Sequence, residues 1–125
     1  MRAEPNPVRL AAERRGRRAE AWAVMLLLCK GYRILGRRVK THAGEIDLIA
    51  RSPVGVVCFV EVKARDVYDR AGESLLPRQQ ARIARAAELY LASRQGLRGR
   101  GVRFDAVLVA KGKLPRHVKG AWRPE

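Results

Sequence analysis

Two strand-like segments that carry acidic side chains limit the folds open to this chain. The first spans residues 44–50 (GEIDLIA) and the second spans residues 59–63 (FVEVK). Residues 52–55 (SPVG) have the composition of a turn, so the pattern predicts an antiparallel hairpin with strands at about 45–51 and 56–64. Because side chains alternate along a strand, the register of this hairpin decides which of them meet.

The length of the connection sets that register. A connection of five residues, or of four with a bulge, places Asp47 directly opposite Glu61. The Cβ atoms of opposed residues lie about 4.5–5.5 Å apart, where like charges repel each other. A cation between the two carboxylates removes this repulsion, so the sequence predicts a metal site between them.

Strict alternation predicts which side chains of the hairpin share a face. Ile46, Leu48 and Ala50 fall on one face of the first strand. In the second strand, Glu61 and Lys63 share a face and lie about 6.5 Å apart by the rise per residue. A lysine at that distance can reach water on a metal held by Glu61. An alternative without a metal site remains open. In it, Glu61 and Lys63 form an exposed salt bridge and Asp47 is solvated.

The overall charge points to a polyanionic partner. The chain carries 27 lysine and arginine residues against 12 acidic ones, for a net charge of +15. This balance favours nucleic acid, with DNA as the expected form, over an anionic membrane surface. No membrane partner is expected, because the apolar run at 21–29 is too short to span a bilayer.

Periodicity and turn residues predict one α/β domain with a mixed sheet flanked by helices, in the order αβββαβ. The length of 125 residues suffices for one core. The expected elements are a helix at 10–29 capped by Gly31, strands at 32–40, 45–51, 56–64 and 102–110, and a second helix at 76–94.

The domain is expected to span residues 10–112. A flexible tail at 1–9 precedes it, and a basic tail at 113–125 follows, whose short apolar run could add an edge strand. Trp22 and Tyr90 are expected in the core.

The cysteines favour a reducing, cytoplasmic location. Cys29 and Cys58 both lie in apolar runs, which is typical of packed, reduced thiols. Together with His42 and His117 they make no zinc-ligand spacing. His42 is expected to be a loop residue.

Polar residues on the two predicted helices add to the pattern. Glu20 shares a helical face with Ala23 and Leu27, where a carboxylate is costly without a partner. Gln80 shares a face with apolar residues of the second helix. On that helix Arg78, Arg82 and Arg85 form a separate stripe, which is either a solvated face or a set of phosphate contacts.

The combination of motifs resembles the small uncharacterised bacterial YraN-type proteins. The residues that carry the resemblance are Glu20, GEID at 44–47, FVEVK at 59–63, PRQQ at 77–80 and Phe104-Asp105. It covers roughly residues 10 to 110. That family is thought to adopt the restriction-endonuclease-like fold and to be distantly similar to archaeal Holliday-junction resolvases.

The resemblance implies a set of roles. Asp47 and Glu61, with the backbone oxygen of Val62, would hold Mg²⁺ or Mn²⁺, and Lys63 would orient or activate the attacking water. Glu20 would complete the acidic cluster. Gln80 matches a glutamine that supports such sites, whereas the family commonly has lysine at the position of Gln79. The basic side chains assigned to nucleic-acid binding are Arg65, Arg78, Arg82 and Arg85.

Three functions therefore compete. The first is a metal-dependent endonuclease-like protein that hydrolyses DNA, branched DNA included, and the second is a non-catalytic nucleic-acid-binding module that retains the fold. The third is an interaction protein whose basic surface docks on an acidic partner or on ribosomal RNA. Branched-DNA resolvases generally work as dimers, so a homodimer stays open. Asp105 could join the acidic cluster or hold a strand end by pairing with Arg103, and the sequence favours neither.

Overall fold

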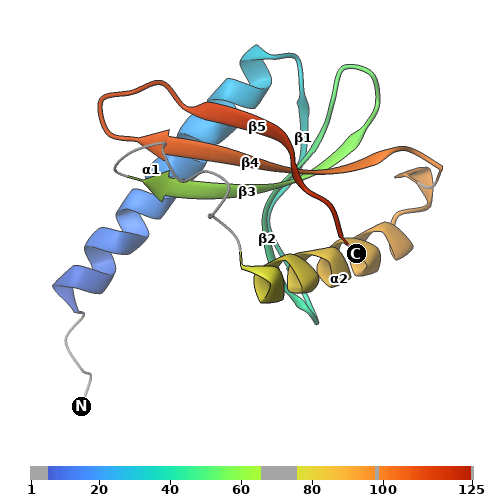
Figure 1. Ribbon diagram of the computed structural model, residues 1–125, viewed down its shortest axis with the longest axis horizontal. Coiled ribbons are helices and arrows are strands. Elements are labelled where there is room, and N and C mark those ends of the chain that lie inside the picture. Colours follow the sequence, from blue (N-terminus) through green and yellow to red (C-terminus); the bar gives the residue numbers. More distant parts are fainter. Residues whose placement is uncertain (1–5, 66–75, 98, 125) are drawn as a thin grey trace.

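The computed structural model describes residues 6–65, 76–97 and 99–124, which form a five-stranded mixed sheet between two α-helices (Figure 1). The elements are α1 (Pro7–Cys29), β1 (Arg33–Thr41), β2 (Gly44–Arg51), β3 (Val57–Arg65), α2 (Pro77–Ala92), the 3₁₀ turn η2 (Gln95–Leu97), β4 (Val102–Ala110) and β5 (Arg116–Trp122). The strands lie in the order β1-β2-β3-β4-β5, and of these described pairs β3–β4 is parallel and the others are antiparallel. The predicted α/β class is confirmed.

Local signals explain where the helices begin and end. The side chain of Asn6 accepts the N–H of Val8 at 2.9 Å at the start of α1. Gly31 has φ +83 after α1, so it supplies the predicted left-handed cap, and Tyr32 N–H donates to Leu27 O at 2.9 Å. Pro77 opens α2, as predicted.

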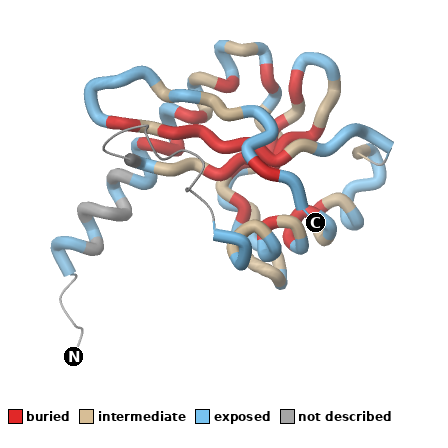
Figure 2. The backbone as a smooth tube through the Cα atoms, in the orientation of Figure 1, coloured by how far each residue is buried: buried red, intermediate tan, exposed pale blue. Residues whose placement is uncertain are grey.

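The two helices cover opposite faces of the sheet, and the buried residues concentrate in the central strands (Figure 2). On one face Ile83 and Tyr90 of α2 pack with Phe59 of β3. On the other face Leu27 of α1 packs with Val60 of β3. Adjacent residues of β3 thus alternate between the two clusters, as expected for a central strand.

Tyr90 is buried as expected, but the expectation for Trp22 is wrong, because 55% of its surface is exposed. Ala19, Ala23 and Leu27 face the sheet instead. Cys29 is likewise exposed rather than packed.

The connection between β2 and β3 has the five residues 52–56, and Ser52 closes it by accepting the Val56 N–H on its Oγ at 3.0 Å. The strands pair with Leu48 opposite Val60. Asp47 and Glu61 are the next residues of the two strands, and their side chains lie close enough for a hydrogen bond.

Strict alternation fails at Asp47. Ile46 packs in the cluster beneath α2, whereas Leu48 packs in the cluster beneath α1, so the expectation that they share a face is wrong. The neighbouring strand explains the irregularity. The β1–β2 register places Arg38 opposite Asp47, and Arg38 has φ +49, which interrupts regular pairing. In the part of the chain that the structure describes, it is the only non-glycine residue with positive φ.

Strand β5 pairs antiparallel with β4. It lies in the segment expected as a basic tail and is the edge strand that the apolar run allowed. Neither of the described helices is long and apolar enough to cross a membrane.

Candidate functional site

The corner formed by Asp47 and Glu61 is under-satisfied in its polar contacts. Glu61 is only 8% exposed, and its Oε1 has no hydrogen-bond partner among the described residues. Asp47 does have a hydrogen-bond donor, because its Oδ2 accepts the backbone N–H of Val62 at 2.8 Å. A buried carboxylate oxygen without a donor is costly, so a cation or a donor bound at Glu61 Oε1 would remove this cost.

The pKa of Glu61 reflects its burial beside a second carboxylate. Burial, then the negative charge of Asp47 and a hydrogen bond to it, raise the pKa of Glu61 from 4.5 to about 8, although Lys63 opposes the shift. Glu61 is therefore mainly protonated at neutral pH. A cation bound beside Asp47 would favour its ionised form.

The donor set fits a hard divalent cation that keeps several waters. Within residues 6–65, 76–97 and 99–124, no three His, Cys, Asp or Glu side chains gather closely enough to hold a metal by themselves. Mg²⁺ is commonly bound through only one or two protein carboxylates together with water and substrate phosphate. Asp47 and Glu61 supply two such carboxylates, and the backbone of Val62 lies against Asp47.

Glu20 does not reach this corner as a free carboxylate. Its Oε1 pairs with Arg37 Nε at 3.1 Å and its Oε2 with Arg38 Nε at 2.8 Å. The hydrogen bond and charge of Glu20, together with the charges of Glu45 and Asp47, raise the pKa of Arg38 above its ordinary value.

Glu20 and Asp47 nevertheless share a pocket of about 410 Å³ between α1 and the hairpin. Its walls are made by Gly16, Arg17, Glu20, Arg38, Lys40, Glu45, Asp47 and Val62. Among the described residues expected at the site, Glu61, Lys63 and Gln80 do not line this pocket.

The second helix approaches the hairpin from the opposite face. Gln80 lies in the first turn of α2, with its N–H donating to Leu76 O at 3.0 Å. A Cβ added at Gly44 would lie 2.9 Å from Cδ of Arg82, so this arginine lies close against the hairpin, and the φ of +143 at Gly44 favours glycine there. The Gln79 side chain accepts the Leu76 N–H at 3.2 Å, so it caps the start of the helix.

The predicted nucleic-acid-binding arginines are only partly clustered. Arg78, Arg82 and Arg85 are exposed on α2, and Arg85 pairs with Glu88 at 3.2 Å. The side chain of Arg65 lies outside the described part of the chain. His42 is exposed in the turn between β1 and β2, as expected for a loop residue.

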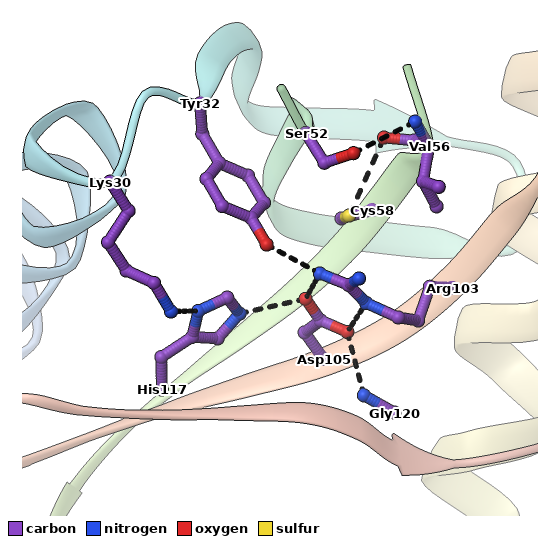
Figure 3. Close-up of polar contacts among 9 residues, drawn as sticks. All are labelled: Lys30, Tyr32, Ser52, Val56, Cys58, Arg103, Asp105, His117 and Gly120. Atoms are coloured by element: carbon purple, nitrogen blue, oxygen red, sulfur yellow. Dashed lines mark hydrogen bonds and ion pairs between the residues drawn. The ribbon is translucent and has the colours of Figure 1, made fainter. Parts of the chain in front are cut away.

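Asp105 lies outside the acidic corner, in a network of its own (Figure 3). Fully buried, it accepts two hydrogen bonds from Arg103, at 2.7 and 2.8 Å, one from His117 Nε2 at 2.8 Å and one from Gly120 N–H at 2.9 Å. Burial alone would raise the pKa of Asp105, but these hydrogen bonds hold it well below its usual range. Of the two roles left open, Asp105 thus takes the pairing with Arg103.

The sequence pointed to Arg103 as a partner of Asp105, but not to His117 and not to the two arginines that pair with Glu20. His117 joins Asp105 to α1, because its Nδ1 lies 2.6 Å from Nζ of Lys30. Arg37 and Arg38 were not singled out at all. The pair of adjacent arginines that follows Gly36 was the available signal.

Comparisons with known proteins agree with the motifs. The model of the uncharacterised protein family UPF0102 matches residues 19–109. A UPF0102 protein of Paramagnetospirillum magneticum is 50% identical over 125 residues, covering 97% of this chain and 96% of that one. Another, from Parvibaculum lavamentivorans, is 51% identical over 115 residues, covering 92% and 86%. The resemblance to YraN-type proteins is thereby confirmed, and the chain belongs to the UPF0102 family.

Proposed function

We propose that this protein binds DNA and hydrolyses phosphodiester bonds with Mg²⁺ or Mn²⁺ at the Asp47–Glu61 corner. The observation that carries the proposal is the buried Oε1 of Glu61, which has no hydrogen-bond partner among the described residues and lies beside a second carboxylate, in a chain of net charge +15. A nucleic-acid partner accounts for the charge, and a cation accounts for the carboxylates.

Each residue of the corner would have a separate role in catalysis. Asp47 and Glu61, with the backbone oxygen of Val62, would hold the cation, which lowers the pKa of a bound water and neutralises charge on the phosphate. Lys63 is close enough to Glu61 to affect its pKa. Its ammonium group would therefore orient the attacking water or contact the phosphate. Gln80 would support the corner from α2.

Isosteric substitutions test this proposal. Purified protein is incubated with linear and four-way-branched DNA in Mn²⁺, and the products are compared for wild type, Asp47→Asn and Glu61→Gln. Either substitution should abolish cleavage, because each removes one anionic ligand. The control is Glu88→Gln on the exposed face of α2, which should cleave at the wild-type rate. Cleavage that survives both corner substitutions would assign the activity to another site or to a contaminant.

A second candidate is the non-catalytic nucleic-acid-binding module. It is favoured by the engagement of Glu20 with two arginines, which leaves only two carboxylates at the corner. This protein would bind DNA equally well in EDTA and in Mn²⁺, without products. Its affinity would fall with salt, with a slope of about −0.9 per phosphate neutralised on duplex DNA.

A further inference from the structure

Arg37 and Arg38 are neighbours in β1, yet both contact one carboxylate. Regular strand geometry would send their side chains to opposite faces of the sheet. The positive φ of Arg38, +49, breaks that alternation and lets both guanidinium groups meet Glu20. Arginine is an uncommon choice in this region of backbone space, and such strain persists only where the surroundings over-determine it.

Glu20 contacts each of the two arginines through the Nε atom of that arginine. It is buried, at 7% exposure, and gives one oxygen to each Nε. Among the residues with described positions, the Nη groups of these arginines have no hydrogen-bond partner. The side chains are 53% and 45% exposed, so their remaining donors face solvent as a fixed pair. Guanidinium groups held in this way suit phosphate oxygens.

The surroundings of this pair are basic as well. Arg17 and Lys40 line the adjoining pocket together with Arg38 and Asp47. Arg14 is also exposed on α1. Basic side chains of α1 and β1 thus lie around the pocket that Asp47 lines.

We propose that Glu20 positions Arg37 and Arg38 to bind backbone phosphates of duplex DNA beside Asp47. Glu20 is then a positioning residue rather than a metal ligand. This inference rests on the nucleic-acid partner of the proposed function, but it needs neither metal nor cleavage.

The inference is tested by DNA binding in the absence of metal. The decisive quantity is the direction in which Glu20→Gln changes the affinity. The binding of a fluorescein-labelled DNA duplex is followed by anisotropy in EDTA, for wild type and Glu20→Gln. Removing a negative charge close to DNA should by itself tighten binding. Loss of a positioning residue should instead weaken it roughly fivefold or more, because two long side chains must then be ordered on binding.

Two further variants keep the test decisive. The double variant Arg37→Ala/Arg38→Ala should lose on the order of tenfold in affinity and flatten the salt slope by about 1.8, as expected for two phosphate contacts. Arg33→Ala, an exposed arginine at the start of the same strand, is the matched control and should flatten the slope by less than half of that. Circular dichroism and thermal melting of each variant establish that it is folded.

Unchanged or tighter binding by Glu20→Gln, with a double variant no worse than the Arg33 control, would overturn the inference. That result would leave metal-dependent cleavage at Asp47 untouched, whereas absence of cleavage with the expected binding pattern would refute only the catalytic proposal. Tighter binding of single-stranded RNA than of the duplex in the same assay would overturn the assignment to duplex DNA.

Discussion

Glu61 and Asp105 are buried carboxylates on adjacent, parallel strands, and they have opposite surroundings. Asp105 accepts four hydrogen bonds, from Arg103, His117 and Gly120, and its pKa lies well below its usual range. Glu61 has one oxygen without a donor among the described residues, and its pKa is raised to about 8. The sheet buries both groups, so burial alone does not separate them.

The difference lies in the hydrogen-bond donors that surround each carboxylate. Asp105 has a complete set of donors from β4 and β5, so it joins these strands and has no capacity left for a ligand. Glu61 shares its corner with a second carboxylate instead of a donor. An incomplete polar site in an otherwise well-packed sheet is the pattern expected where a ligand completes the set.

The largest effect should come from removing the satisfied carboxylate. Asp105→Ala leaves Arg103 and His117 without their acceptor, and we expect it to lower the free energy of unfolding by about 3–5 kcal/mol. Asp47→Asn should change it by less than about 1 kcal/mol, because the amide oxygen still accepts the Val62 N–H. Urea denaturation at pH 7 without metal measures both values, and similar losses would erase the distinction between the regions.

Added metal should stabilise the protein only by binding at the Asp47–Glu61 corner. Mn²⁺ at 100 times its dissociation constant should raise the free energy of unfolding by about 2.7 kcal/mol. Thermal melting with and without Mn²⁺ measures the gain. Glu61→Gln should show almost none of it, and a full gain in that variant would place the metal elsewhere.

The two carboxylates should give opposite dependences of stability on pH. Glu61 has a pKa raised from 4.5 to about 8 in the fold, so the folded state retains its proton in this window and stability falls by about 1.4 kcal/mol per pH unit as the pH rises. Asp105 has a lowered pKa, so its contribution is present above about 3.8 and is lost as the pH falls below that value.

Urea denaturation between pH 2 and 9 separates these two contributions. The Glu61→Gln variant should lose the decline between pH 4.5 and 8 and keep the acid loss. An unchanged decline in this variant would mean that other groups cause it.

The smallest effect should come from an exposed carboxylate, which serves as the baseline. Glu88 is 70% exposed and pairs with Arg85. We expect Glu88→Gln to change the free energy of unfolding by less than about 0.5 kcal/mol, with no change in its pH dependence or in the response to Mn²⁺. Urea denaturation under the same conditions checks this, and a larger loss would show that surface charge dominates the stability of this basic chain.

The sequence was sufficient to predict the hairpin and its facing carboxylates, because turn length and strand alternation are local properties. Counting from the five-residue connection gives the register in which Leu48 pairs with Val60, next to Asp47 and Glu61. The cap at Gly31 and the start of α2 at Pro77 also follow from local chemistry.

The arginine partners of Glu20 and the contact of Asp105 with His117 could not be predicted in the same way. The contact between Glu20 and Arg38 depends on a positive φ that arginine rarely adopts, and the contact between Asp105 and His117 depends on how β5 pairs with β4. The exposure of Trp22 had a similar cause. The apolar residues of α1 fall on more than one side of the helix, and packing chose the stripe containing Ala19 and Ala23.

The most direct test of a cation site at the Asp47–Glu61 corner is calorimetric titration with Mn²⁺ at pH 7 in two buffers of different ionisation enthalpy. Because Glu61 has a pKa of about 8, binding should release about one proton per metal ion, and Glu61→Gln should abolish the proton release and weaken binding. Binding with no proton release, or equal binding by wild type and Glu61→Gln, would contradict the account.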